Sequence, residues 1–321
     1  MSHKVLSFDL GGTKVAAGIV NSTGKVLEEL RVPVSVHQGK QAVLQQLYLL
    51  GQKFLKQHRE INRIGIASAG PLDPEKGELL EPTNFAGQGK PWGKVPLTHW
   101  MRKNLNCQVY LENDAAAAAL AEHWVGSGKK YKNMMVLTLG TGLGTGILVN
   151  GKLLRSGRNL HPEAGHMVIR LGDQSAPCGC GNLGCAEAYL SGKNFEQRAR
   201  IRLGRSDLIN KDIANLARRG HPEALALFEE YSELMSIAVH NFVRLFNPEI
   251  LIFTGSFANT ADLFLKNTEK KLKKLLARQQ TVMKAIPKLT VSKLKNNSGL
   301  IGGAYIALHH PLHSVERSQV K

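Results

Sequence analysis

Short hydrophobic runs separated by turn residues open the chain. Residues 5–10, 14–20 and 25–34 are rich in Val, Leu and Ile, and Gly-Gly-Thr and Asn-Ser-Thr-Gly stand between them. Runs of this length and composition favour β-strands, and Gly and Asn are typical of the tight turns that join strands. The pattern therefore predicts an antiparallel three-stranded meander at the start of the chain.

Residues 134–155 repeat this pattern. An apolar run at 134–139 precedes the glycine-rich segment GTGLGTG at 140–146, and shorter apolar runs follow at 147–149 and 152–154. We predict a strand, a glycine-rich turn and two further strands. Two meanders of one design, each with a Gly-Thr hairpin, predict a duplicated fold whose hairpins face each other across a cleft that holds a nucleoside triphosphate. The GxxxxGK[ST] motif of P-loop proteins does not occur.

Helical periodicity dominates much of the remaining chain. Apolar residues recur at helical spacing along 41–58, which predicts a helix packed on the first sheet. Further predicted elements are strands 64–68, 109–111, 250–254 and 289–294, and helices 115–124, 222–246, 262–278 and 299–310. The fold class is α/β, with two domains that each contain a mixed sheet flanked by helices. We expect an N-terminal lobe of residues 1–114 plus 299–313, a C-terminal lobe of 115–298 and a loose tail of 314–321.

A segment rich in Cys and Gly follows the second meander. Its candidate metal ligands are His166, Cys178, Cys180 and Cys185. Thiolate and imidazole suit Zn²⁺, and a tetrahedral site with four protein ligands is structural. A redox or disulfide cluster is the alternative, which the odd number of clustered cysteines and the lack of a secretion signal disfavour. We predict a structural zinc ion that cross-links this loop and holds Glu163 and Glu187 beside it.

Asp114 follows a predicted strand and precedes a strong helix former. Ligands of open α/β sheets gather where strands end, and Asp114 closes the sequence Glu-Asn-Asp at such an end. Two interpretations remain open: Asp114 is the N-cap of the helix, or it is a catalytic base.

Other polar residues lie at the ends of the N-terminal strands. Asp9 ends the first strand, and the backbone N–H groups of the turn after it, with Lys14, are suited to phosphate oxygens. Gly70 lets a ligand approach the backbone after the strand at 64–68. Asn84 is either a turn residue or a ligand for a polyol.

Composition limits the class of protein. With 321 residues, 43% of them hydrophobic, the chain is long enough for two domains with a sizeable core. It has no signal-peptide pattern at its start and no run approaching ~18 apolar residues, so we expect a cytoplasmic protein without a membrane partner.

The net charge of +17 fits a nucleic-acid or membrane partner, or a solvated basic surface that attracts phosphorylated small molecules. No recognition motif accompanies the charge, so we favour a solvated surface, with the dense run 266–274 on one exposed helix face.

Taken in order, these motifs resemble the ROK family (repressor, open reading frame, kinase), the sugar kinases of the actin-like ATPase superfamily with its ribonuclease H-like fold. The resemblance rests on DLGGTK at 9–14, END at 112–114, LGTGLGTG at 139–146, EAGH at 163–166 and CGCGNLGCAE at 178–187. It covers nearly the whole chain. It implies ATP-dependent phosphorylation of a hexose, with Mg²⁺, a structural Zn²⁺ and a homodimer.

The resemblance also implies roles for single residues. Asp114 matches the general base, and His166 both binds zinc and faces the sugar. The residues expected at the sugar are Gly70, Asn84, Asn113, Asp114, Glu163, His166 and Glu187. Those expected at ATP are Asp9, Gly11, Gly12, Thr13, Lys14, Thr141, Gly142 and Gly255. Those expected at zinc are His166, Cys178, Cys180 and Cys185.

Four positions depart from the family pattern. Thr145 and Ser256 stand where Gly is common, Ala116 where Asn is common, and Pro162 in a usually Gly-Ala stretch. These departures bring nucleotide affinity into question more than the chemistry, because the catalytic and zinc positions are kept. Glucose, phosphorylated at its 6-hydroxyl, is the expected acceptor, and N-acetylglucosamine, N-acetylmannosamine, mannose and fructose are the alternatives. A sugar-sensing or DNA-associated binding protein without turnover is the interpretation from another class, favoured only by the charge.

Overall fold

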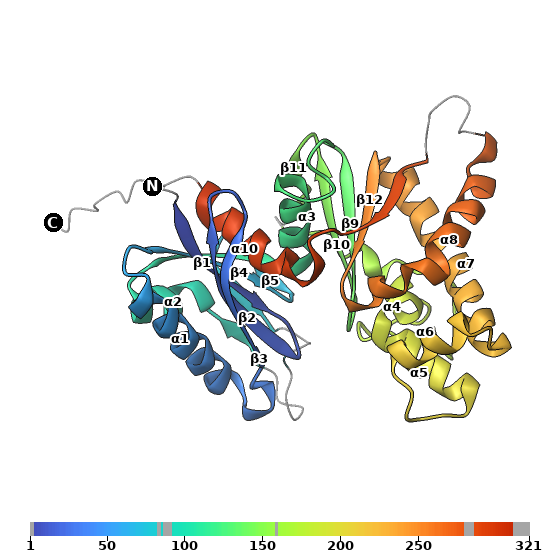
Figure 1. Ribbon diagram of the computed structural model, residues 1–321, viewed down its shortest axis with the longest axis horizontal. Helices are drawn as coiled ribbons and strands as arrows, with labels where there is room; N and C mark the ends of the chain where they lie inside the picture. Colours follow the sequence, from blue (N-terminus) through green and yellow to red (C-terminus); the bar gives the residue numbers. More distant parts are fainter. Residues whose placement is uncertain (1–2, 82–84, 86–91, 158–159, 279–285, 311–321) are drawn as a thin grey trace. The chain divides into compact units, whose positions relative to one another are not determined.

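The computed structural model of the protein describes residues 3–81, 85, 92–157, 160–278 and 286–310. The chain forms two compact units, Met1–Glu112 with Gly303–Lys321, and Asn113–Gly302. Each unit has its own five-stranded sheet (Figure 1). Each also has its own hydrophobic core. The predicted loose tail lies outside the described residues.

The first unit contains the predicted N-terminal meander. Its sheet has the order β3-β2-β1-β4-β8. The strands are β1 (Lys4–Leu10), β2 (Lys14–Asn21), β3 (Val26–Pro33), β4 (Arg63–Ser68) and β8 (Gln108–Asn113). β2 pairs antiparallel with both β1 and β3, whereas β4 pairs parallel with β1. The meander and the two later strands of this sheet are thus confirmed.

Alternate residues of β4 face two different helical layers. Ile64 and Ile66 join the core under α1 (Lys40–Gln57) and α2 (Leu97–Leu105), which lie side by side in Figure 1. Gly65 points the other way, toward α10 (Ser298–His309). A Cβ atom on Gly65 would stand 1.8 Å from the carbonyl oxygen of Gly303, so only glycine lets α10 pack this closely.

A small antiparallel sheet completes the first unit. Its strands are β5 (Leu72–Asp73), β6 (Glu78–Leu80) and β7 (Lys94–Val95), in the order β5-β6-β7. The hydrophobic pattern did not predict it, because strands of two or three residues are too short to show a period.

The second unit repeats the strand order of the first. Its sheet has the order β11-β10-β9-β12-β13. The strands are β9 (Met134–Leu139), β10 (Leu143–Val149), β11 (Lys152–Leu153), β12 (Ile250–Thr254) and β13 (Lys288–Val291). As in the first unit, a meander of antiparallel strands is extended by a strand that pairs parallel with the first one. The predicted duplication is confirmed at the level of topology.

One predicted boundary in this sheet is wrong. The segment 140–146 was expected to be a turn, but β10 already begins at Leu143. The glycines at 144 and 146 are strand residues whose missing side chains leave room for the start of a helix. A Cβ on Gly146 would lie 2.1 Å from the carbonyl oxygen of Ala115. Only Gly140 to Gly142 form the turn, closed by a 3.1 Å hydrogen bond from Gly140 N–H to the carbonyl oxygen of Gly142.

Helices cover both faces of the second sheet. α3 (Asp114–Trp124) packs its alanines on one face, against Val136, Leu148 and Ile252. Residues on the other face share one hydrophobic core with five helices: α4 (Ala186–Leu190), α5 (Gly192–Leu203), α6 (Asn210–Arg218), α7 (Pro222–Phe246) and α8 (Ala261–Leu275). Short 3₁₀ turns are η1 (Val36–Gln38), η4 (Ala164–His166), η5 (Ser256–Thr260) and η6 (Lys295–Asn297). α7 has the predicted bounds, with Pro222 in its first turn.

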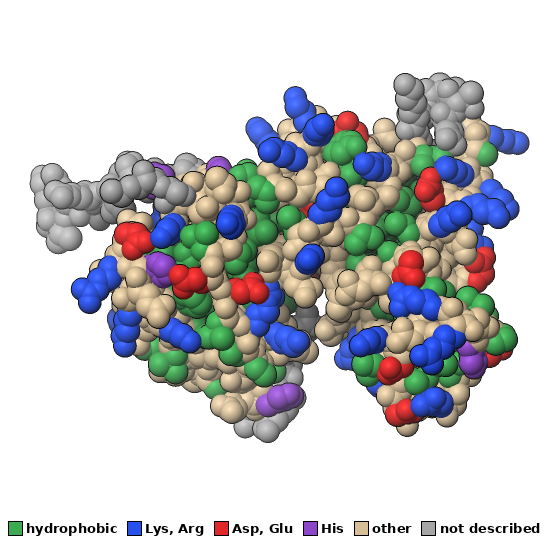
Figure 2. Space-filling view, in the orientation of Figure 1, with side chains coloured by type: hydrophobic (Ala, Val, Ile, Leu, Met, Phe, Trp, Pro, Cys, Tyr) green, Lys and Arg blue, Asp and Glu red, His purple; other side chains and the backbone are tan. Residues whose placement is uncertain are grey.

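Basic side chains are distributed over the surface. Figure 2 shows Lys and Arg over much of the visible face, with Asp and Glu among them. The lysine-rich run of α8 is an exposed helix face, as predicted, and two of its cations pair with acidic neighbours: Lys271 with Glu229, and Lys273 with Glu269. Within the described ranges, no helix combines the length and the apolarity needed to cross a bilayer.

Candidate active site and metal cluster

Asp114 is the first residue of α3, but it is not the cap of that helix. The side chain of Asn113 accepts hydrogen bonds from Ala115 N–H at 2.9 Å and from Ala116 N–H at 3.1 Å, so Asn113 is the N-cap. The N-cap interpretation of Asp114 is therefore wrong. The Asp114 carboxylate accepts the N–H of Ala115 at 2.8 Å and remains partly exposed at the positive end of the helix dipole.

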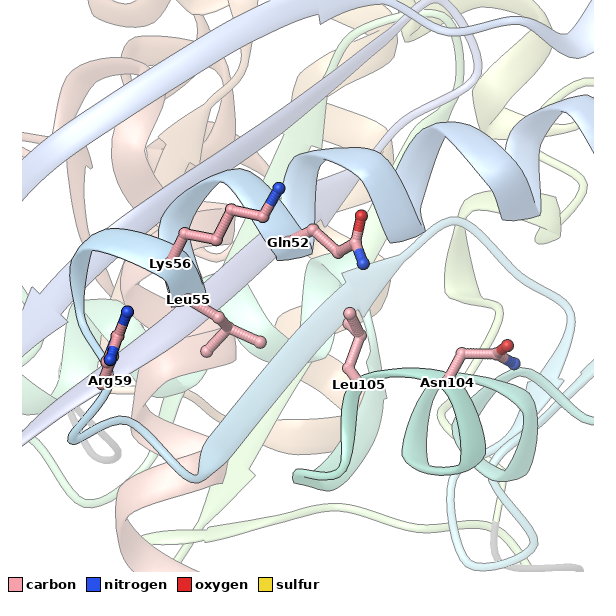
Figure 3. A pocket seen from close by; sticks show the side chains of 6 residues that line it. All are labelled: Gln52, Leu55, Lys56, Arg59, Asn104 and Leu105. Atoms are coloured by element: carbon pink, nitrogen blue, oxygen red, sulfur yellow. The ribbon is translucent and has the colours of Figure 1, made fainter.

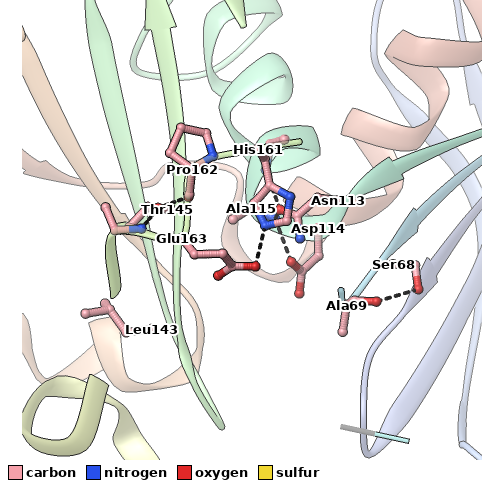
Figure 4. Close-up of polar contacts among 12 residues, drawn as sticks. Ser68, Ala69, Asn113, Asp114, Ala115, Leu143, Thr145, His161, Pro162 and Glu163 are labelled. Carbon is pink, nitrogen blue, oxygen red and sulfur yellow. Dashed lines mark hydrogen bonds and ion pairs between the residues drawn. The ribbon is translucent and has the colours of Figure 1, made fainter. Parts of the chain in front are cut away.

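Two further ionisable side chains lie beside Asp114 within the second unit. Figure 4 shows Asp114, His161 and Glu163 close together. His161 Nε2 lies 2.9 Å from Glu163 Oε1, and the His161 side chain is buried. Asp114 and Glu163 were predicted site residues, whereas His161 was not. The signal that could have identified it is a histidine two residues before Glu163 in the sequence.

The cluster shifts the pKa values of its two carboxyl groups in opposite directions. Burial raises the pKa of Asp114 above its ordinary value; the N–H of Ala115 and the charge of His161 act against this shift, while the charge of Glu163 adds to it. Burial also acts to raise the pKa of Glu163, but the hydrogen bond and charge of His161, with the charge of His166, outweigh it and leave that pKa lowered. The two carboxyl groups are thus suited to different roles.

The loop that carries Glu163 is held to β10 by Thr145. The Thr145 hydroxyl donates to the carbonyl oxygen of Pro162 at 2.8 Å and accepts the N–H of Ala164 at 3.3 Å. Gly165 passes so close to β10 that a Cβ there would lie 2.1 Å from the carbonyl oxygen of Leu143. Thr145, one of the departures from the family pattern, therefore orders the loop of Glu163.

The four predicted metal ligands converge in the second unit. The ligand atoms of His166, Cys178, Cys180 and Cys185 all lie within 4.8 Å of one another. Cys178 Sγ is 3.4 Å from His166 Nδ1, and Cys180 Sγ is 3.7 Å from Cys185 Sγ. With Zn–S and Zn–N distances of about 2.3 and 2.0 Å, ligand atoms of a tetrahedral site stand roughly 3.5–3.8 Å apart. The donor set and its spacing fit Zn²⁺, and the cysteines are not joined by disulfides.

Glu187 connects this cluster to the turn between β9 and β10. Its Oε2 accepts the N–H of Leu143 at 2.9 Å, and its Oε1 lies 3.6 Å from Cys178 Sγ. A Cβ on Gly142 would stand 2.5 Å from Glu187 Oε2, so a side chain at position 142 would displace the Glu187 carboxylate from this place. Glu187 thus links the cysteine loop to a turn that was expected to contact ATP.

The residues expected at ATP lie on turns in each unit. In the first unit, Gly11 N–H donates to the carbonyl oxygen of Lys14 at 3.0 Å, and Thr13 and Lys14 are exposed. Gly12 lies inside the turn that this bond closes, Asp9 lies near the end of β1, and Gly70 follows β4. In the second unit Thr141 is exposed, and Gly255 has a φ of 89° and approaches Leu139 too closely for any side chain. Asn84 lies outside the described residues.

A separate surface pocket of about 290 Å³ lies between α1 and α2 (Figure 3). It is lined by Gln52, Leu55, Lys56, Arg59, Asn104 and Leu105. None of the predicted site residues lines it.

The chain is similar to known proteins along nearly its whole length. The model of the ROK family matches residues 5–310. The chain belongs to the ROK family. The chain is 30% identical to a glucokinase of Streptomyces coelicolor, over 94% of its own length and 96% of the relative. An N-acetyl-D-glucosamine kinase of Salmonella newport is also 30% identical, over 94% of this chain and 98% of the relative.

The ROK fold is also evident from solved structures. A ROK glucokinase from Streptomyces griseus, crystallised with glucose and AMPPNP, is 26% identical and superimposes with a TM-score of 0.83. The match covers 95% of this chain and 99% of the other. The α/β units of this ROK protein therefore have the actin-like ATPase fold, as predicted.

Proposed function

We propose that this ROK protein, an ATP-dependent sugar kinase, phosphorylates a hexose, with glucose at its 6-hydroxyl as the first choice. The observation that carries the proposal is the position of Asp114: a carboxylate at the start of α3 with a raised pKa, beside the Glu163–His161 pair. A general base is most effective when its pKa lies near the working pH, and desolvation moves Asp114 in that direction.

In the proposed reaction, Asp114 accepts the proton of the attacking hydroxyl. The hydroxyl oxygen then forms a bond to the γ-phosphorus, and the bond to the β–γ bridging oxygen breaks to release ADP. Most of the rate enhancement in such a transfer comes from positioning and charge stabilisation, and Mg²⁺ bound with the triphosphate would supply part of that charge stabilisation. Glu163 and Asn113 are proposed to bind sugar hydroxyls, and the turns at Gly11–Lys14 and Gly140–Gly142 to receive the phosphates.

We propose that the Cys₃His cluster holds Zn²⁺. All four tetrahedral positions are filled by protein, so the metal has no open position for substrate and its role is structural. His166 ends η4, three residues after Glu163, so a fixed imidazole restrains the loop that carries the proposed sugar ligand.

The N-acetylhexosamines are the second acceptor class, because the Salmonella relative is an N-acetylglucosamine kinase. A coupled assay of ADP release against glucose, mannose, fructose, N-acetylglucosamine and N-acetylmannosamine tests both. We expect ATP-dependent turnover with glucose at the highest kcat/KM. A higher value for an N-acetylhexosamine would replace glucose as substrate, and no turnover with any of the five would contradict the proposal.

A further inference from the structure

His161 is a buried histidine that no predicted role uses. Its side chain is only 7% exposed, yet it contacts a Glu163 side chain that is 52% exposed. We propose that His161 is a positioning residue that fixes the Glu163 carboxylate for a sugar hydroxyl. This inference rests on the proposed function, because it takes Glu163 as a ligand of the acceptor sugar.

The contact geometry separates the two oxygens of Glu163. Oε1 lies 2.9 Å from His161 Nε2, on the buried side. Within the described parts of the chain, Oε2 has no hydrogen-bond partner, and more than half of the side chain is accessible. The Glu163 carboxylate is thus restrained through one oxygen, while the other oxygen is open to a ligand. Because the side chain is already held in place, a ligand that binds to it does not have to pay the entropy of fixing its rotamer.

A purely stabilising role accounts poorly for this pair. An ion pair with one half-exposed partner contributes little to stability, because solvent screens it. Burying an imidazole to hold an exposed carboxylate is therefore a weak way to stabilise the fold. It is an effective way to orient that carboxylate.

The loop around the pair is built to keep this geometry. Pro162 stands between the two partners and fixes its own φ, while Thr145 holds both Pro162 and Ala164 through one hydroxyl. Thr145 and Pro162 both depart from the ROK pattern, and His161 directly precedes Pro162. Together, His161, Pro162 and Thr145 form a brace that holds Glu163.

His161 also acts on Asp114 through its charge. The charged groups that act on Asp114 are His161, which lowers its pKa, and Glu163, which raises it. Loss of the imidazole removes the favourable charge, so the pKa of Asp114 rises. Asp114 can act as a base only when it is deprotonated. With a higher pKa it becomes protonated earlier as the pH falls, so the acid limb of the pH–rate profile moves to higher pH.

Two variants separate the brace from the charge. In His161→Ala we expect the sugar KM to rise about tenfold with a smaller change in kcat, because a hydrogen bond to a charged group is lost. In His161→Gln the amide N–H₂ can still donate to Glu163, so the KM should return to within about threefold of wild type. Neither alanine nor glutamine carries a charge, so the acid limb of the pH–rate profile should move to higher pH in both variants.

The control is His240→Ala on α7, where the imidazole's hydrogen-bond partner among the described residues is the neighbouring Asn241. We expect wild-type KM and pH profile in this variant. If wild type turns over a sugar but His161→Ala keeps its KM, the inference is overturned and the proposed function stands. Equal KM losses in the alanine and glutamine variants would also overturn it. If the wild-type protein neither phosphorylates any sugar of the panel nor binds one by calorimetry, both the inference about His161 and the proposed function are contradicted.

Discussion

Replacing Asp114 with asparagine is expected to lower kcat for the hexose by about a thousandfold while sugar binding is largely retained. The amide is nearly isosteric and its oxygen can still accept the N–H of Ala115, so the start of α3 is preserved. It cannot accept the proton of the attacking hydroxyl, and loss of general-base catalysis costs roughly 10²–10⁴ in rate. Steady-state kinetics and calorimetric sugar binding measure the two effects separately.

Asp262→Asn is the matched control for this change. Asp262 also lies in the first turn of a helix of the second unit, α8, but there it pairs with Arg218 on the surface. We expect its kcat to match wild type. A kcat near wild type in Asp114→Asn would remove Asp114 as the base, whereas equal losses in both variants would point to a general effect on folding.

Removing the metal is expected to give the second largest effect. We predict about one Zn²⁺ per chain, and in Cys185→Ala the loss of that metal, a sugar KM raised at least tenfold and a lower melting temperature. Cys185 is fully buried and directly precedes α4, which carries Glu187, and a structural zinc site contributes to folding outright. Metal analysis, kinetics and thermal unfolding provide the three measurements.

Cys107→Ala is the control for the loss of a buried thiol. Cys107 belongs to the core of the first unit and to none of the metal ligands. This variant should keep its zinc and its sugar KM. Wild-type protein purified without chelator that contains no zinc, or metal-free protein with an unchanged sugar KM, would contradict the structural role of the metal.

Most of the fold could be predicted because its strands are long enough to show hydrophobic runs. β12 has the predicted bounds, and both meanders are where the pattern placed them. The segment 140–146 was misread because its glycines were assigned to a turn, although two of them are strand residues that admit α3. Close backbone packing and turn formation both require glycine, and sequence alone does not separate the two causes.

The candidate site, too, could be predicted from the sequence only in part. Three thiols and one imidazole in a short segment predicted the metal cluster, because the ligands lie close together in the sequence. The roles of Asn113 and His161 depend on which side chain points where: Asn113 and Asp114 are both good caps, and only the structure distinguishes them. Thr145 was expected to bear on nucleotide binding, but its hydroxyl bonds to the loop of Glu163, a partner distant in sequence.

The most direct test of the account is a crystal structure of the protein with its hexose and a non-hydrolysable ATP analogue. We expect an Asp114 carboxylate oxygen within about 3 Å of the hydroxyl that faces the γ-phosphate, and Glu163 Oε2 bonded to another hydroxyl of the same sugar. A hexose bound where Asp114 reaches none of its hydroxyls would contradict the assignment of Asp114 as the general base.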